Sequence, residues 1–264
     1  MFNLQYGDCL EVLPTIDTQV DFIFTDLPYG TTKCSWDTPI DLPKLWEQYW
    51  RLLKPNGCVA MFAQSPFDKY LAMSCMEYYR YEWIWEKTSA TGHLNAKKMP
   101  MKAHENILIF YKSLPTYNPQ KTSGHVRKTS KAEHKTNSKE SDVYNKGQKL
   151  TTYDSTERYP RDVLKFKSDK QKECLIATQK PVALCEYFIK TYTNPGDLVL
   201  DSCMGSCSSG IAAIKNDRRF IGIDNNLDHM LIAQDRMEKQ SGELDLEIDF
   251  AGVLEELERD QLYA

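Results

Sequence analysis

The chain has 264 residues, 41% of them hydrophobic, and a formal net charge of −4, so it can bury one sizeable core, alone or with a smaller appended unit. It contains no apolar run of about 18 residues and no amino-terminal signal pattern, and we therefore expect a soluble, cytoplasmic protein without a membrane span. Its eight cysteines are scattered and form no CxxC pair, which argues against a zinc site and favours reduced, buried thiols.

Residues 1–112 alternate between strand-like and helix-like segments. Short apolar runs ending in Gly, Pro or Asp predict strands, and helical periodicity with flanking breakers predicts helices. Residues 88–104 are expected to form a loop. The expected strands are 2–6, 20–26, 58–63, 81–85 and 107–111, and the expected helices are 9–13, 42–53 and 66–76.

The stretch VDFIFTDLPYG, residues 20–30, predicts a buried strand that stops abruptly. The carboxyl ends of strands are where open α/β sheets bind ligands. The Asp26 carboxylate and the Leu27 carbonyl can both accept hydrogen bonds from an amino group. Pro28 fixes the turn, and Tyr29 offers a flat face for stacking a base. The alternative is an ordinary turn whose aspartate caps a helix.

Residues 113–172 interrupt the alternation and carry most of the positive charge. They hold 14 Lys and Arg against 7 Asp and Glu, a local charge of +7, which leaves −11 for the rest of the chain. A basic insert on an acidic body is typical of a nucleic-acid contact surface. Because the segment is also rich in Ser, Thr and Asn, a solvated loop is the alternative. Its length exceeds that of an ordinary connection, which favours a functional insert.

The alternation returns after the insert. Helices are expected at 181–192, up to residue 215 and at 227–239, strands at 197–201 and 219–224, and an acidic tail at the end. Strand, small-residue loop, helix, strand and acidic residue, with Asp201 and Asp224 at the two strand ends, form the nucleotide half-site of a doubly wound fold. As a glycine fingerprint the loop is weak, because Cys207 stands between Gly205 and Gly210. An ordinary βαβ unit is the alternative.

Four motifs in order carry a resemblance. The strings DLPY (26–29), TQKP (178–181), DSCMGS (201–206) and GID (222–224) resemble the amino-methylating DNA methyltransferases, and their order is similar to the permuted β-type subgroup found in bacteria and phages. The resemblance implies an α/β fold with a doubly wound, mostly parallel Rossmann-like sheet. It implies methyl transfer from S-adenosylmethionine to adenine N6 in double-stranded DNA, as in restriction-modification, with a homodimer as one assembly to consider.

The resemblance also divides the chain and assigns residues. Residues 1–112 would be the catalytic half, 113–172 the target-recognition insert, and 173–264 the cofactor-binding half. Asp26, the Leu27 carbonyl and Pro28 would surround the target amino group, and Tyr29 would stack on the flipped base. Asp224 would bind the cofactor's ribose, Asp8 its adenine, and Lys180 its carboxylate. The full set expected at the cofactor is Asp8, Lys180, Asp201, Met204, Gly205, Ser206 and Asp224. No metal ligands are implied.

Three positions depart from the family pattern. Leu27 replaces the commoner proline, which should be tolerated because the backbone carbonyl does the work. Cys203 stands where phenylalanine is frequent, and Cys207 replaces a glycine. A side chain there would narrow the cofactor loop or require a different backbone angle.

Other functions stay open at this point. Cytosine-N4 methylation shares the fold and mechanism, although Asp rather than Ser at position 26 favours adenine within the family. A release-factor-type glutamine methyltransferase is disfavoured by the motif order. A DNA-binding relative that has lost the cofactor is a further alternative, suggested by Cys207.

Overall fold

The computed structural model describes residues 2–30, 37–130, 152–169, 175–176, 178–241 and 246–249. The chain forms two compact units. The larger comprises Met1–Asn118 with Asp162–Ala264, and the smaller comprises Pro119–Arg161. No helix within the described ranges is both long and apolar enough to cross a membrane.

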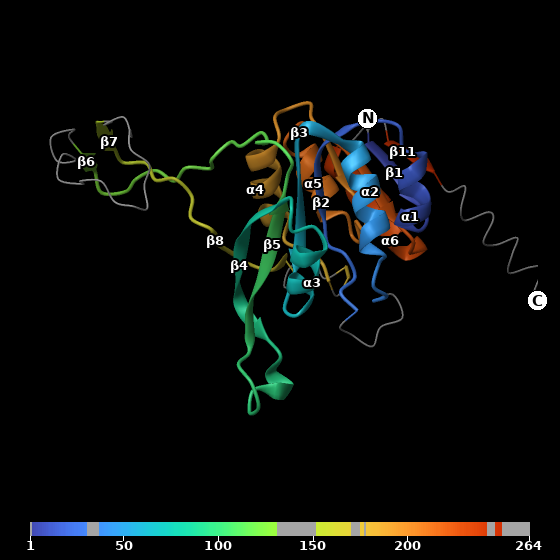
Figure 1. Cartoon of the computed structure of the whole chain (residues 1–264), viewed down its shortest axis with the longest axis horizontal. Helices are drawn as coiled ribbons and strands as arrows, with labels where there is room; N and C mark the ends of the chain where they lie inside the picture. The colour runs from blue at the N-terminus through green and yellow to red at the C-terminus, as the bar shows by residue number, and fades with distance from the viewer. Residues whose placement is uncertain are drawn as a thin grey trace, which may run out of the picture. The chain divides into compact units, whose positions relative to one another are not determined.

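The larger unit is built on a nine-stranded sheet, as far as the described residues show (Figure 1). Its spatial order is β11-β1-β10-β9-β2-β3-β5-β4-β8, and only β5 runs antiparallel to its neighbours. The strands are β1 (Phe2–Tyr6), β2 (Val20–Thr25), β3 (Leu53–Ala63), β4 (Tyr79–Thr91), β5 (Lys102–Phe110), β8 (Val163–Phe166), β9 (Leu198–Asp201), β10 (Arg219–Asp224) and β11 (Leu246–Asp249).

Helices cover both faces of this sheet. The six α-helices are α1 (Cys9–Val12), α2 (Leu42–Leu52), α3 (Phe67–Ser74), α4 (Val182–Tyr192), α5 (Ser208–Ile214) and α6 (Leu227–Ser241), counted over the described residues. One core packs α4, α5 and α6 on one face, and a second packs α1, α2 and α3 on the other. Strand β2 contributes to both cores: Phe22 and Phe24 pack in the first, and Ile23 packs in the second. This explains its continuous apolar sequence, and the doubly wound, mostly parallel fold expected from the sequence is confirmed.

The winding direction of the sheet reverses between β9 and β2. From β2 the chain crosses through α2 to β3 on one side, and from β9 it crosses through α5 to β10 on the other. The two strands pair in parallel, with Phe22 opposite Val199 and Ile23 opposite Leu200. Their carboxyl ends therefore lie at the same edge, and such a reversal leaves a crevice there that open α/β sheets use for ligands.

The expected loop at 88–104 is wrong in part, because both flanking strands extend into it. β4 continues to Thr91 and β5 begins at Lys102, so the segment is a β-hairpin that projects from the sheet (Figure 1). The pairing register shifts between Glu86 and Thr91, and such irregularities re-aim side chains beside functional sites. The hairpin could not be predicted from the sequence, because residues 88–104 are all exposed and therefore show no alternation of apolar and polar side chains.

Two short edge strands were also missed. β8 lies within the predicted insert 113–172 but pairs with β4 in the main sheet, and β11 lies in the segment expected to be a tail. The separate unit, Pro119–Arg161, is therefore narrower than the compositional insert. Its described part contains an antiparallel pair, β6 (Lys128–Ser130) and β7 (Tyr153–Ser155), joined by a bidentate contact from Arg127 to Asp154.

Candidate active site

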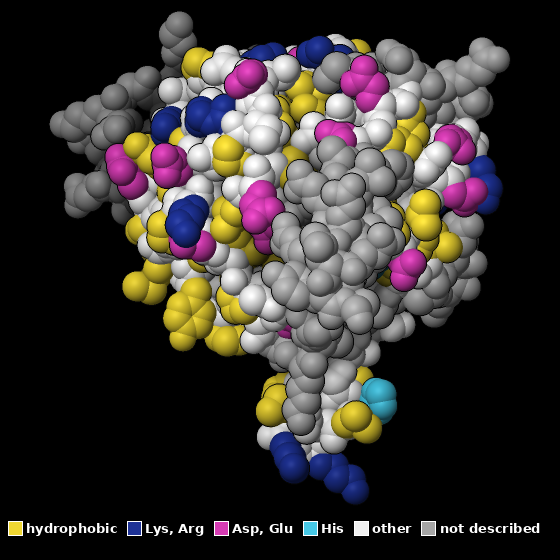
Figure 2. All heavy atoms as spheres, turned by 90° about the vertical axis from the view of Figure 1, so that its right-hand side faces the viewer, with side chains coloured by type: hydrophobic (Ala, Val, Ile, Leu, Met, Phe, Trp, Pro, Cys, Tyr) yellow, Lys and Arg dark blue, Asp and Glu magenta, His cyan; other side chains and the backbone are white. Residues whose placement is uncertain are grey.

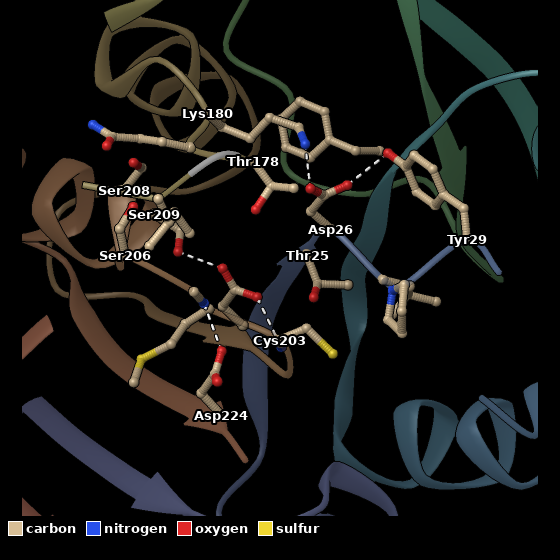
Figure 3. A pocket seen from close by; sticks show the side chains of 18 of the residues that line it. Thr25, Asp26, Tyr29, Thr178, Lys180, Cys203, Ser206, Ser208, Ser209 and Asp224 are labelled. Atoms are coloured by element: carbon tan, nitrogen blue, oxygen red, sulfur yellow. Dashed lines mark hydrogen bonds and ion pairs between the residues drawn. The ribbon is translucent and has the colours of Figure 1, made fainter. Parts of the chain in front are cut away.

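One cavity of about 660 Å³ opens at the carboxyl edge of the sheet, where β2, β9 and β10 end (Figure 3). Both halves predicted from the sequence contribute to its wall. The sequence candidates that line it are Asp8, Asp26, Leu27, Pro28, Tyr29, Lys180, Asp201, Met204, Gly205, Ser206 and Asp224. The fold therefore brings together all the residues to which the sequence analysis assigned a catalytic or cofactor-binding role.

The Asp26 carboxylate is held by two donors at the end of β2. The Tyr29 hydroxyl donates to Oδ1 at 2.6 Å, and the Lys180 ammonium donates to Oδ2 (Figure 3). A carboxylate has about four lone-pair sites. Asp26 thus retains acceptor capacity for another donor while its rotamer is fixed from both sides.

Lys180 belongs to a chain of alternating charges. Its Nζ also lies 3.7 Å from Glu105 Oε2 and 4.9 Å from the centre of the Phe62 ring. Glu105 in turn pairs with Lys87 through its other oxygen. The resemblance implies that Lys180 binds the cofactor's carboxylate, whereas in the structure its ammonium is directed at Asp26 and Glu105.

Burial raises the pKa of Asp26 above its usual value, against the lowering effect of the Lys180 charge. Burial lowers the pKa of Lys180, but the charges of Asp26 and Glu105 outweigh it and the net direction is upward. Burial, reinforced by Asp26, also holds the pKa of Tyr29 well above its usual value. Tyr29 is therefore a neutral donor and Lys180 a cation at neutral pH.

The turn after Asp26 is fixed by local contacts. The Tyr29 ring stacks on Phe67 of α3, with centroids 5.0 Å apart and planes 24° apart. Gly30 adopts φ +65°, a left-handed angle that a side chain disfavours, and its amide donates to the buried Asp37 at 2.8 Å. These contacts hold an aromatic ring in the cavity wall beside the Asp26 carboxylate.

Asp201 lies at the end of β9 and is buried. Its carboxylate accepts hydrogen bonds from the Ser209 hydroxyl and, at 3.2 Å, from the Cys203 amide. Burial raises the pKa of Asp201 to about 6. Asp201 therefore holds the loop that leads into α5, and its ionised form is disfavoured by the fold.

Asp224, at the end of β10, organises the loops on the cofactor side. It accepts hydrogen bonds from the Gly205 amide at 2.8 Å and the Asn226 amide at 3.0 Å. Its Oδ1 also lies 3.1 Å from His229 Nδ1, and this hydrogen bond raises the pKa of His229. Asp8 differs in role, because its side chain caps α1 by accepting from the Leu10 amide at 2.7 Å.

The two cysteines that depart from the family pattern behave differently. Cys207 adopts the left-handed φ of +60° that a glycine would favour, yet its thiol is fully buried and its Sγ lies 3.6 Å from Met237 Sδ. The side chain therefore enters the core and does not line the cavity. Cys203 does line the cavity, next to Cys9, and the hydrogen bond between their thiols raises the pKa of Cys203.

Among the ionisable residues of the cavity wall that sequence reasoning missed are Lys87, Glu105 and His229. Glu105 lies in the amino-terminal half of β5, just before the apolar run from which the strand is predicted. Its proximity to Asp26 could not be predicted, because it requires β5 to run antiparallel to its neighbours. Across the described residues, no three His, Cys, Asp or Glu side chains are grouped as metal ligands.

The family model described as DNA methylase (N6_N4_Mtase) matches residues 20–235. The chain belongs to this DNA methylase family. It is 26% identical over 255 residues to the DNA adenine methyltransferase YhdJ of Escherichia coli K12, covering 89% of this chain and 82% of that protein. It is 28% identical over 246 residues to the type II methyltransferase M1.MboII of Moraxella bovis, covering 84% and 91%.

Solved structures of methylases share the fold. The complex of M1.HpyAVI with S-adenosylmethionine matches with a TM-score of 0.62 and 26% identity, over 90% of this chain and 99% of that one. The cytosine-N4-specific PvuII methyltransferase matches with a TM-score of 0.59 and 15% identity, over 94% and 95%. A methylase named for cytosine N4 thus has this fold, and the likeness of fold does not separate adenine-N6 from cytosine-N4 transfer.

Proposed function

We propose that this DNA methylase transfers a methyl group from S-adenosylmethionine to the N6 amino group of adenine in double-stranded DNA. The observation that carries the proposal is the Asp26 carboxylate, fixed by Tyr29 and Lys180 in the same cavity as Asp201 and Asp224. Aspartate at position 26 and the similarity to an adenine methyltransferase favour adenine over cytosine.

The cavity fits S-adenosylmethionine in size and in its polar groups. Asp224 offers a carboxylate to the ribose hydroxyls, and three hydrogen bonds already hold it in place. Met204, Gly205 and Ser206 form a short loop beside it, and Asp8 lies at the same cavity. Once bound, S-adenosylmethionine supplies an electrophilic methyl group on a sulfonium.

The residues of the β2 end act on the target base. An aromatic amine is a poor nucleophile because its lone pair is delocalised into the ring. Hydrogen bonds from the amino group to Asp26 and to the Leu27 carbonyl draw that lone pair towards tetrahedral geometry. Pro28 fixes the turn, and Tyr29 stacks on a base that has left the duplex, an interaction worth roughly 1–3 kcal/mol. Positioning and preorganised acceptors supply the acceleration.

Lys180 has a different role in this proposal. Its charge counters the effect of burial on Asp26, so that the carboxylate stays an acceptor near neutral pH. We therefore assign Lys180 to the catalytic carboxylate, in place of the cofactor-binding role expected from the sequence. Glu105 and Lys87 hold the Lys180 ammonium from the other side.

The target-recognition role of the 113–172 segment is also a proposal. Its support is the local charge of +7 and the separate unit at Pro119–Arg161. We expect charge reversal at Lys128 and Lys131 to weaken binding to all duplexes alike. Lys128 is exposed on β6, while Lys131 lies outside the described residues. Exchanging this unit with that of a related methylase should change the methylated sequence, and an unchanged sequence would place specificity elsewhere.

The decisive experiment is product analysis with the Asp26→Ala variant. Purified chain is incubated with unmethylated DNA and S-adenosylmethionine, and the hydrolysed nucleosides are identified by mass spectrometry. We expect N6-methyladenine from the wild type, none from Asp26→Ala, and cofactor affinity within a few fold of wild type, because Asp26 contacts the amino group. N4-methylcytosine would overturn the adenine assignment. Equal loss of cofactor binding would move Asp26 to the other half of the site.

A further inference from the structure

The β4–β5 hairpin beyond the sheet has a composition unlike the rest of the larger unit. We call residues 88–104 the hairpin arm. It contains three lysines and two histidines and no Asp or Glu, although the chain outside 113–172 carries −11. Every residue of the arm is exposed. Figure 2 shows Lys, His and hydrophobic side chains gathered at its tip.

Large apolar side chains at the tip point into solvent. Leu94 is 87% exposed and Met99 is 55% exposed. Single exposed apolar residues are common, but a cluster on a projecting element marks an interaction site. Lys97 and Lys98 stand between these two residues in the sequence, so positive charge and apolar surface are combined at one place.

The tip is an ordered turn. Gly92 adopts φ +88°, and a short 3₁₀ helix, η2 (His93–Asn95), follows it. Backbone hydrogen bonds close the turn, from the Lys98 amide to the Asn95 carbonyl at 2.8 Å and from the Met99 amide to the same carbonyl at 3.0 Å. The exposed side chains are thus presented from a fixed backbone, which reduces the entropy lost when a partner binds.

The arm begins at the active site. Thr88, Ser89, Ala90 and Thr91 line the same cavity as Asp26. Leu94 follows three residues later, in the short 3₁₀ helix at the tip of the arm. A base that enters the cavity therefore leaves its duplex next to the arm.

We propose that the hairpin arm is a DNA-contact element that enters the major groove beside the target base, an inference that rests on the proposed function. The major groove admits a two-stranded β-ribbon. Lys97 and Lys98 lie on phosphates, and Leu94 and Met99 lie on base edges. DNA fits this surface better than a second copy of this chain. The lysines of the arm could pair with the acidic body of another copy, but that pairing would not explain the exposed apolar side chains at the tip.

The two kinds of contact have separable signatures. The double variant Lys97→Ala/Lys98→Ala should make the negative slope of log affinity against log salt shallower by roughly 1.8, since each phosphate contact contributes about −0.9. Leu94→Ala should leave that slope unchanged and raise the KM for DNA about tenfold, because burial of a leucine side chain is lost. The probes are a labelled duplex of mixed sequence, without cofactor, and unmethylated plasmid as substrate.

Matched controls lie on α6, where Lys239→Ala and Leu231→Ala remove an exposed lysine and an exposed leucine. We expect both controls to keep the wild-type slope and KM. The inference is overturned if the arm variants behave like these controls, or if they change the sedimentation coefficient and not DNA binding, which would make the arm a contact between copies. If the wild-type chain binds DNA through the arm but transfers no methyl group, the proposed function is refuted and the inference about the arm still holds.

Discussion

Replacing Lys180 by glutamine tests whether the catalytic carboxylate depends on its neighbouring cation. The substitution keeps a hydrogen-bond donor of similar length but removes the positive charge that Asp26 and Glu105 share. Glu105 retains Lys87 as a partner. Asp26 loses the only ion pair that it makes among the described residues, and burial then raises its pKa without an opposing charge.

The size of the effect follows from the geometry. Two unit charges about 4 Å apart at an effective dielectric constant of about 20 interact by about 4 kcal/mol. One pKa unit corresponds to about 1.4 kcal/mol, so removing the cation should raise the pKa of Asp26 by about 2–3 units. The active form is the carboxylate, because a protonated acid has lost acceptor capacity. As the pH is lowered, the variant should therefore lose activity at a higher pH than the wild type does.

The assay is the initial rate of methyl incorporation into unmethylated DNA, measured from pH 5.5 to 9 at low DNA concentration. We expect the acid limb of kcat/KM to move upward by about 2 units or more in Lys180→Gln, with S-adenosylmethionine affinity close to wild type. Lys165→Gln is the matched control, because Lys165 pairs with Glu86 on the exposed side of β4. If the acid limb stays in place and cofactor affinity falls instead, Lys180 serves the cofactor's carboxylate and our assignment is wrong.

Three further predictions concern the cofactor loops. Asp224→Ala should weaken S-adenosylmethionine binding about 10- to 100-fold by calorimetry, since a charged hydrogen bond contributes about 1.5–3 kcal/mol, while DNA affinity without cofactor stays unchanged. Cys207→Gly should be more stable to urea than Cys207→Ala by roughly 0.5–1 kcal/mol, because glycine adopts the left-handed angle without strain. The cofactor affinity of Cys207→Gly should stay within about twofold of wild type. A clear gain in affinity would mean that the thiol crowds the cavity. Asp201→Asn should stabilise the cofactor-free protein by about 1–3 kcal/mol at pH 7, because the folded pKa of about 6 exceeds the usual 3.8 and the fold disfavours the ionised form; this gain, measured by urea unfolding, should shrink as the pH falls from 6 towards 4.

The sequence predicts well which residues of the site lie at the carboxyl ends of strands. β2, β9 and β10 have continuous apolar sequences because both of their faces are buried, and each is closed by an aspartate and a turn. Parallel neighbours bring such ends together without further information. The edge strands β8 and β11 escaped prediction for the converse reason, since four residues with alternate exposure contain too little apolar sequence to stand out.

The direction in which individual side chains point could not be predicted from the sequence. Cys207 was expected to narrow the cofactor loop, but a left-handed backbone turns its Cβ into the core against Met237. Lys180 was expected at the cofactor, and in the structure its ammonium donates to Asp26 and lies 3.7 Å from Glu105 on the antiparallel strand β5. Both outcomes depend on a backbone angle or a strand direction that no local pattern encodes.

The permuted motif order works because the site depends on neighbouring strands and not on sequence order. β2 precedes β9 by most of the chain, yet they pair, and the hydroxyls of Thr25 and Ser202 lie 3.3 Å apart across the two ends. The connection between them contains the smaller unit, whose flanking residues are fixed to the main sheet unit: the Asn118 amide donates to the Thr191 carbonyl at 2.7 Å, and the Ile84 amide donates to the Asp162 carbonyl at 2.7 Å. Under our proposal, residues between these two anchors can therefore change what DNA is recognised without displacing the carboxylates that carry the chemistry.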